Sequence, residues 1–133
     1  MCFRCRSHQN CSTGGSLGFA QLVYLIGDFS VVEPTAAMTA SLTKVLAWLA
    51  DRYGLDTAPG ATTTFVSRGS QRYVAGTAVT SSTIAGHRDM SYTDCPGGTV
   101  YFALDRLRSE VHAQRAAWRG ATWQAQRLGL RSP

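Results

Sequence analysis

A histidine and a cysteine lie in one short polar loop of the chain, which reads IAGHRDMSYTDCPGG from Ile84 to Gly98. A zinc ion accepts imidazole nitrogen and thiolate sulfur together, and a catalytic zinc usually has three protein ligands and one position for water. His87 and Cys95 would supply two of these ligands. Gly86 is expected to let the backbone bend before the histidine, and the Pro-Gly-Gly run predicts a turn after the cysteine. The loop is therefore expected to hold both side chains in fixed directions.

The metal interpretation depends on the wider pattern, because a lone histidine or cysteine is more often an ordinary structural residue. The letters GHRDMSYTDCPG resemble the GHRD-x4-DCPG signature of the zinc-dependent N-acetylmuramoyl-L-alanine amidases, a family that includes amidase-type bacteriophage lysozymes and peptidoglycan recognition proteins. The resemblance implies that His87 and Cys95 bind Zn²⁺. It also implies a bacterial hydrolase of peptidoglycan, which cleaves the amide between N-acetylmuramic acid and the L-alanine of the stem peptide.

The neighbours of the two predicted ligands have expected roles as well. Thr93 occupies a position where family members carry a lysine or a small polar residue that helps to hold the oxyanion, so the resemblance implies a catalytic role for Thr93. A role as a turn residue is the alternative. Asp89 would orient His87 or cap a turn. Arg88 would be a surface charge or a contact for stem-peptide carboxylates.

The third zinc ligand of the family has no counterpart in this chain. In the family it is a histidine on an early strand, and a tyrosine or glutamate from the same half assists the chemistry. Neither His8 nor His112 matches the missing position. The resemblance therefore implies a partial amidase domain at 16–111, between a leader at 1–15 and a basic tail at 112–133. We expect the gene to begin upstream of Met1, and the chain alone to bind zinc weakly and to have little activity.

The first residues offer two competing patterns. Cys2, Cys5, His8 and Cys11 recur every three residues, which is tight for a structural zinc site because little chain remains to turn around the ion. The letters SHQNCSTGGSLG instead resemble the family segment GAH-x5-NTGSLG, in which the histidine lies near the site without binding zinc. A poorly ordered leader is the third interpretation.

The charge pattern bears on partners and location. The net charge is +5, and the excess is at the two ends: 1–27 and 111–133 contain six arginines and no acid. No part of the chain interleaves arginines with stacking aromatics, so we expect no nucleic-acid partner. Attraction to an anionic cell wall would account for the positive charge as well as binding to nucleic acid would. No apolar run reaches the length of about 18 residues that a membrane-spanning helix needs. The resemblance implies an extracellular or cell-wall location, although no export signal is visible. A noncatalytic peptidoglycan-recognition module is the alternative function.

The remaining patterns predict the elements that position the loop. Leu22 to Ile26 is apolar and rich in branched residues, which predicts a central strand buried on both faces. Pro34 to Tyr53 predicts an amphipathic helix that ends at Gly54. Two threonine- and valine-rich segments, 62–67 and 77–83, predict strands on either side of a surface excursion. Val100, Leu104, Leu107 and Val111 are spaced for a second helix that begins after Gly98.

Together these elements predict an α/β fold in which a mixed central sheet is flanked by helices. The expected arrangement is that of a peptidoglycan recognition protein lacking its N-terminal strands, with the 22–26 strand between the two helices. For the tail at 112–133 the sequence leaves three interpretations open, which are a continuing helix, a linker and an unselected end.

Overall fold

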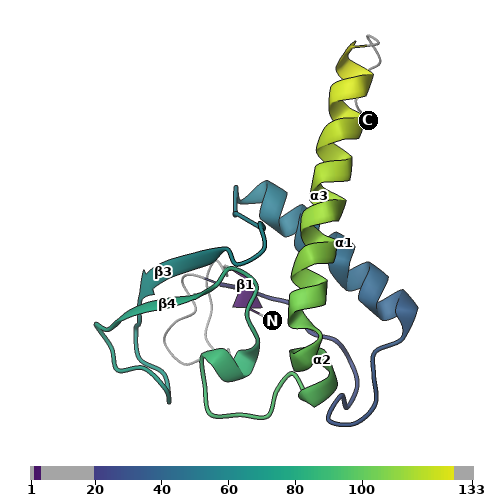
Figure 1. The fold of residues 1–133 in the computed structure, drawn as a ribbon. Coiled ribbons are helices and arrows are strands. Elements are labelled where there is room, and N and C mark those ends of the chain that lie inside the picture. The colour runs from purple at the N-terminus through teal and green to yellow at the C-terminus, as the bar shows by residue number, and fades with distance from the viewer. Residues whose placement is uncertain (1, 4–19, 128–133) are drawn as a thin grey trace.

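The computed structural model describes residues 2–3 and 20–127 of the 133-residue chain. These residues form a small mixed α/β structure, which confirms the predicted class (Figure 1). The elements in chain order are β1 (Cys2–Phe3), β2 (Gln21–Leu22), α1 (Ala36–Arg52), β3 (Thr62–Val66), β4 (Ala78–Ser82), the short 3₁₀ helix η2 (His87–Asp89), α2 (Gly98–Phe102) and α3 (Leu104–Arg127). In the described ranges the strands form two separate antiparallel pairs, β1–β2 and β3–β4.

Helix α1 lies in the predicted segment, but it begins at Ala36, two residues after the predicted Pro34, and ends at Arg52. The Thr35 hydroxyl caps its first turn by accepting a hydrogen bond from the Met38 N–H at 3.2 Å. At the other end, Gly54 has a φ of +62°, the left-handed conformation in which glycine commonly terminates a helix. Leu42, Leu46 and Leu49 from the predicted apolar stripe are buried, whereas Val45 and Tyr53 at its edges are exposed.

Removal of the α1 cap should lower stability modestly. Thr35→Ala leaves the Met38 N–H without its side-chain acceptor, and loss of such a cap costs about 1 kcal/mol. Urea denaturation followed by circular dichroism measures the change. Thr35→Ser retains the hydroxyl and is the matched control, so equal losses in the two variants would show that the cap contributes nothing.

The main hydrophobic core joins α1 directly to α3. Leu46 of α1 and Val111 of α3 are fully buried, and Ile84 from the segment before η2 lies in the same cluster. The other buried members are Leu42, Ala47, Leu49, Leu104 and Leu107. Ile84 thus connects the candidate loop to the main hydrophobic core.

The predicted central strand at Leu22 to Ile26 is wrong as an element and as a position. Only Gln21–Leu22 is β-strand, and it pairs with β1 rather than lying between the helices, which pack on each other. Beyond it, Val23 and Leu25 pack against the core, but Tyr24 is 67% and Ile26 is 94% exposed. The apolar run therefore has one buried side instead of two. The central mixed sheet is likewise not found in the described part of the chain.

The strands β3 and β4 confirm the two predicted strands, and the structure pairs them as a hairpin. They pair antiparallel from Thr62 opposite Ser82 to Val66 opposite Ala78, and the segment between them forms the predicted excursion. Val79 is the buried residue of β4, and β3 is mostly exposed. Within Figure 1 the hairpin lies to one side of the helix pair, with the candidate loop following from β4 toward α2.

Helix α3 continues well into the predicted tail. It runs unbroken to Arg127, so residues 112–127 are helical, which was one of the three interpretations of the tail. The C-terminal half of α3 extends beyond the rest of the molecule (Figure 1). Arg115 and Arg119 form ion pairs with Asp51 of α1 at 3.4 and 3.0 Å. Hydrogen bonds from Arg119 and then Arg115 lower the pKa of the Asp51 carboxyl.

The proposed domain boundaries, including the one at residue 111, stay predictions. No helix in the described ranges is long and apolar enough to span a membrane.

Candidate functional site

His87 and Cys95 line the same pocket, which has a volume of about 320 Å³. We call it the His–Cys pocket. Its wall is otherwise mainly apolar and comes from the end of β2 and the segment after it, from Leu42 of α1 and from the first turn of α2. The lining residues are Leu22, Val23, Tyr24, Leu25, Gly27, Asp28, Phe29, Ser30, Leu42, His87, Asp94, Cys95, Pro96, Gly97 and Val100. The two predicted ligands thus meet at one cavity.

His87 is carried by η2, which begins directly after Gly86. The His87 carbonyl accepts hydrogen bonds from the backbone N–H groups of Met90 and Ser91 at 2.9 and 3.0 Å, and the histidine is half-buried. Gly86 has φ −80° and ψ 160°, an extended conformation that any residue adopts. A Cβ atom there would instead lie 2.9 Å from the ring of Tyr101. Glycine is needed at this position for close packing, and the bend predicted from its flexibility is wrong.

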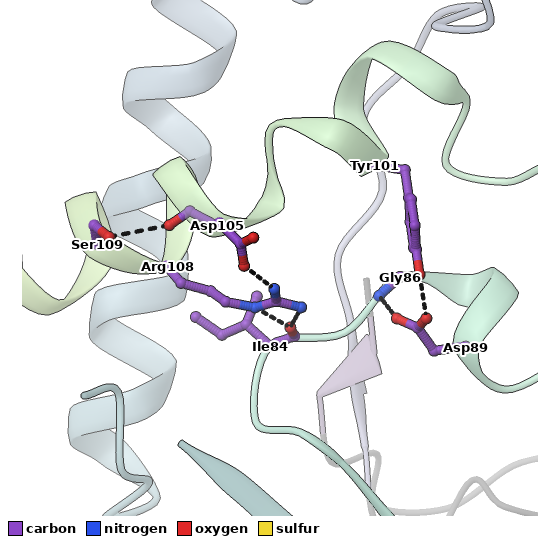
Figure 2. Close-up of polar contacts among 7 residues, drawn as sticks. All are labelled: Ile84, Gly86, Asp89, Tyr101, Asp105, Arg108 and Ser109. Atoms are coloured by element: carbon purple, nitrogen blue, oxygen red, sulfur yellow. Dashed lines mark hydrogen bonds and ion pairs between the residues drawn. The ribbon is translucent and has the colours of Figure 1, made fainter. Parts of the chain in front are cut away.

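The turn that carries His87 is closed by Asp89 and Tyr101. One Asp89 oxygen accepts from the Gly86 N–H at 2.7 Å, and the other accepts from the Tyr101 hydroxyl at 2.6 Å (Figure 2). The hydrogen bond to Asp89, together with burial and the carboxylate charge, raises the pKa of Tyr101. Asp89 therefore caps the turn, as one of its two predicted roles required, and Tyr101 of α2 holds it in place.

Arg88 connects the histidine turn to the cysteine turn. Its backbone N–H donates to the Cys95 carbonyl at 3.0 Å, and its guanidinium donates to the Asp94 carbonyl. The same guanidinium lies 4.5 Å from the centre of the Tyr101 ring, a cation–π geometry. Its Nε atom is buried without a hydrogen-bond partner among the described residues. Arg88 is thus an internal brace of the loop rather than a simple surface charge, and its contact with stem-peptide carboxylates stays a prediction.

Cys95 lies in a tight turn with its thiol exposed and free of any disulfide. The Thr93 hydroxyl accepts from the Cys95 N–H at 3.2 Å, and the Gly97 N–H donates to the Asp94 carbonyl at 2.8 Å, which confirms the turn after the cysteine. The Cys95–Pro96 peptide bond is cis. Thr93 is not part of the wall of the His–Cys pocket. Its hydroxyl supports the turn, and its catalytic role stays a prediction.

Gly97 is seated against the backbone of the segment before α1. It has φ +90°, and a Cβ atom on it would lie 2.4 Å from the carbonyl carbon of Phe29. Beside it, the Thr99 N–H and hydroxyl both donate to the Phe29 carbonyl, at 3.1 and 2.8 Å. The cysteine turn is therefore fixed to residues that lie far away in sequence.

The described residues provide only part of the ligand set that a zinc ion needs. Asp28 and Asp94 also line the His–Cys pocket, but the described part of the chain contains no group of three or more His, Cys, Asp or Glu side chains placed to hold a metal. His112 lies elsewhere, on α3, with its Nδ1 3.2 Å from the Thr57 hydroxyl. The Cys2/Cys5/His8/Cys11 pattern, and His8 with it, rests on side chains that lie outside those the structure describes. His87 and Cys95 would therefore be two ligands of an incomplete set.

Two contributors to this site were missing from the sequence interpretation. Tyr101 follows Gly97 by one helical turn, yet nothing in the sequence indicates that its hydroxyl reaches Asp89. Phe29, whose carbonyl receives Thr99, belongs to a segment separated from the loop by the whole of α1 and the hairpin. Such contacts depend on the packing of distant segments, so local patterns carry no signal for them.

Comparison with known proteins adds no assignment. No family model matches the chain, and no curated protein and no solved structure is significantly similar to it.

Loss of the Tyr101 hydroxyl should weaken the loop and change its response to alkali. Hydrogen bonds to charged groups contribute about 1.5–3 kcal/mol, so we expect Tyr101→Phe to lose roughly 2 kcal/mol at neutral pH. Because folding raises the pKa of Tyr101, its contribution is fully present below about pH 10 and is lost as the pH rises through the folded value. Urea denaturation between pH 7 and pH 11 measures both effects. Tyr92→Phe, at an exposed tyrosine, is the control, and identical pH profiles for the two variants would contradict the assignment.

Proposed function

We propose that this chain provides the zinc-binding loop of a zinc-dependent N-acetylmuramoyl-L-alanine amidase domain that acts on peptidoglycan outside the cell or in the cell wall. The observation that carries the proposal is that His87 and Cys95, the two residues named by the GHRD-x4-DCPG resemblance, line one pocket. Zinc held there would polarise the substrate carbonyl and lower the pKa of a bound water to about 7.

The surrounding residues support the proposal through preorganisation. A metal site needs ligands whose positions are set before the ion arrives. Asp89 closes the turn that carries His87, and the Arg88 N–H bonds the carbonyl of Cys95. The Arg88 guanidinium then rests on Tyr101, which itself bonds Asp89. The first two contacts fix the loop backbone and the last two hold the side chains that brace it, so the backbones of the two candidate ligands are held relative to each other by the protein alone.

The proposal assigns the chain an incomplete ligand set. The third ligand and the tyrosine or glutamate that assists proton transfer would come from segments outside the described residues, as the resemblance implies. Two protein ligands bind zinc more weakly than three, and proton transfer needs a positioned group. We therefore expect residues 1–133 alone to bind zinc weakly and to cleave peptidoglycan little.

Metal titration tests the ligands. Cobalt(II) added to the purified chain should produce the absorption of a cobalt–thiolate bond, and Cys95→Ser should abolish it. His87→Ala should weaken binding by at least about tenfold, since second-shell losses alone cost 10–100-fold in metal affinity. His112→Ala is the matched control, because its ring contacts Thr57 outside the His–Cys pocket. Binding that survives both Cys95→Ser and His87→Ala would remove the proposed site.

Digestion of purified cell wall tests the activity. The chain should be joined to the N-terminal strands of a related amidase, and mass spectrometry should then detect stem peptides with free L-alanine ends. The joined protein carrying Cys95→Ser should release none. If residues 1–133 alone release these peptides at a comparable rate, a residue within the chain, such as His8, completes the site, and the account of the missing ligand is wrong.

A noncatalytic peptidoglycan-recognition module is the second candidate function. The observation that favours it is the incomplete ligand set among the described residues. Such a module would sediment with insoluble peptidoglycan and would release no stem peptide, even after the strands of an amidase are supplied. Sedimentation and mass spectrometry on the same samples separate the two functions.

A further inference from the structure

Strand β3 is the outer strand of the β3–β4 hairpin. Within the described ranges β4 is its only strand partner, and no other helix or strand contacts β3 extensively. Figure 1 shows β4 between β3 and the segment that continues to α2. Strand β4 also lines a pocket that it shares with this segment and with α3, whereas no residue of β3 lines it. The side of β3 that faces away from β4, which we call the β3 edge, is therefore the open side of the hairpin.

The register of the hairpin defines which residues of β3 bond β4. In an antiparallel pair, opposite residues alternate between pairs that exchange backbone hydrogen bonds and pairs that do not. At one end of the hairpin the Thr83 N–H donates to the Ala61 carbonyl at 3.1 Å. At the other end the Ser67 N–H donates to the Thr77 carbonyl at 2.8 Å. Residues 61 and 67 are both odd-numbered, so the odd-numbered residues of β3 between them direct their backbone groups toward β4.

The even-numbered residues of β3 direct their backbone N–H and C=O groups away from β4. These residues are Thr62, Thr64 and Val66, and all three are exposed. The hydroxyls of Thr64 and Thr80 lie 2.9 Å apart, which agrees with the close approach of side chains in a pair without backbone hydrogen bonds. The outward groups of the three residues bond no described residue. The β3 edge thus presents a row of donors and acceptors in strand geometry.

The β3 edge lacks the features that commonly protect an exposed strand. Natural edge strands are often very short, charged, bulged or interrupted by proline. Segment 62–66 reads TTTFV, which contains no charge and no proline, and it pairs with β4 without a bulge. Its residue types all favour strands. Because a two-stranded sheet alone is marginally stable, further strands would stabilise this hairpin.

The β3 edge is complementary to a second copy of itself. When two β3 strands pair antiparallel about Thr64, this residue lies opposite Thr64 of the partner subunit. Thr62 then lies opposite Val66 of the partner subunit, so each outward N–H meets an outward C=O. Threonine opposite threonine is a favourable cross-strand pair, and no charge meets a like charge. A register shifted by two residues would leave one end of the edge unpaired.

We propose that this chain forms a two-fold symmetric dimer in which the β3 edges pair and the two hairpins become one four-stranded antiparallel sheet. Both copies use the same surface, so the assembly closes at two subunits. Pairing along so short a strand buries little surface, and the dimer is therefore weak and concentration-dependent. It uses neither His87 nor Cys95, and it is independent of the proposed amidase function.

Sedimentation equilibrium of the full chain, with a reducing agent present, tests the proposal. The apparent mass should rise from one copy toward two as the protein concentration increases through the micromolar range into the millimolar range. Thr64→Pro removes an outward N–H but no hydrogen bond to β4, as proline on an edge strand can. It should raise the dissociation constant at least about tenfold, because each dimer loses two hydrogen bonds.

Thr80→Pro is the matched control. It removes the corresponding outward N–H of β4, on the opposite side of the hairpin, and it loses the same contact between the Thr64 and Thr80 hydroxyls. The dimer should be unchanged in this variant. Circular dichroism shows whether each proline variant remains folded.

A contact measured between chains gives a second test that needs no variant. In a mixture of ¹³C-labelled and unlabelled chains, a filtered NOE spectrum detects only contacts between subunits. It should connect the Hα of Thr63 with the Hα of Phe65 of the partner subunit. These residues face each other in the proposed register as a pair without backbone hydrogen bonds, in which the strands approach most closely.

Several results would overturn the proposal. These are a monomer at every concentration, a dimer equally strong in Thr64→Pro, a dimer lost equally in Thr80→Pro, and the absence of the NOE at concentrations where the dimer forms. The effect of salt is a further check: the β3 edge is uncharged and each copy has a net charge of +5, so screening should strengthen the dimer. A dimer that added salt weakens would depend on ion pairs elsewhere. The cobalt–thiolate signal should be the same in Thr64→Pro, so the amidase proposal is judged separately.

Discussion

Replacement of Gly97 by alanine should destabilise the protein by about 3–5 kcal/mol, the sum of two costs. The first is conformational, because Gly97 has φ +90° and ψ 153°, a region that is almost exclusive to glycine. The second is steric, because a Cβ atom would overlap the Phe29 carbonyl carbon at 2.4 Å and its oxygen at 2.5 Å. These are backbone atoms, which cannot rotate away. Urea denaturation at neutral pH measures the loss.

A second glycine separates the two costs. Gly54 also has a positive φ, +62°, but a Cβ atom there would meet nothing within 4 Å. Gly54→Ala should therefore cost only about 1 kcal/mol. If Gly97→Ala remains folded, the displaced cysteine turn should weaken cobalt binding, whereas Gly54→Ala should leave it unchanged. Equal stability losses in the two variants would show that the contact with Phe29 is unimportant.

Truncation of Leu46 should be comparably severe. The side chain is fully buried where α1 meets α3, and replacement of such a leucine by alanine costs about 2–5 kcal/mol through lost burial and the cavity that remains. Because Ile84 belongs to the same cluster, we expect the loop that follows it to lose order as α1 and α3 separate. Thermal and urea denaturation give the stability, and cobalt binding below the melting temperature reports on the loop.

The neighbouring residue provides the control for this core prediction. Val45 is exposed on the same helix, so Val45→Ala tests the effect of shortening a side chain without opening a cavity. Its expected cost is below about 1 kcal/mol. If Leu46→Ala loses no more stability than Val45→Ala, the contact between α1 and α3 does not carry the core.

The helices were predictable because their signals are local. The spacing of Leu42, Leu46 and Leu49 defines the buried face of α1, and Gly54 marks its end, whereas the Thr35 cap emerged only in the structure. The same applies to strands β3 and β4, which form in the predicted threonine- and valine-rich segments, although their pairing was not predicted. Tight turns are local too, so the turn that follows Cys95 was also apparent.

The true structure of the Leu22 to Ile26 segment and the contacts that support the candidate loop could not be predicted. Both depend on what packs against them. An apolar run does not reveal whether one side or two will be covered, and here Tyr24 and Ile26 are exposed. Gly86 illustrates the same limit in the loop: the sequence indicates a flexible residue, but its function is to make room for Tyr101. The pairing of His87 with Cys95 at one pocket followed from the motif, whereas the Asp89–Tyr101 contact did not.

The protruding half of α3 predicts a boundary in amide hydrogen exchange. Ion pairs from Arg115 and Arg119 fasten the helix to Asp51, and the backbone continues as helix to Arg127. A helical segment of this length is marginal in water when no neighbour packs against it. Amides near Val111, at the fully buried core, should exchange only when the whole protein unfolds. Amides after residue 119 should exchange far faster through fraying, so one continuous helix would contain two regions of very different opening free energy.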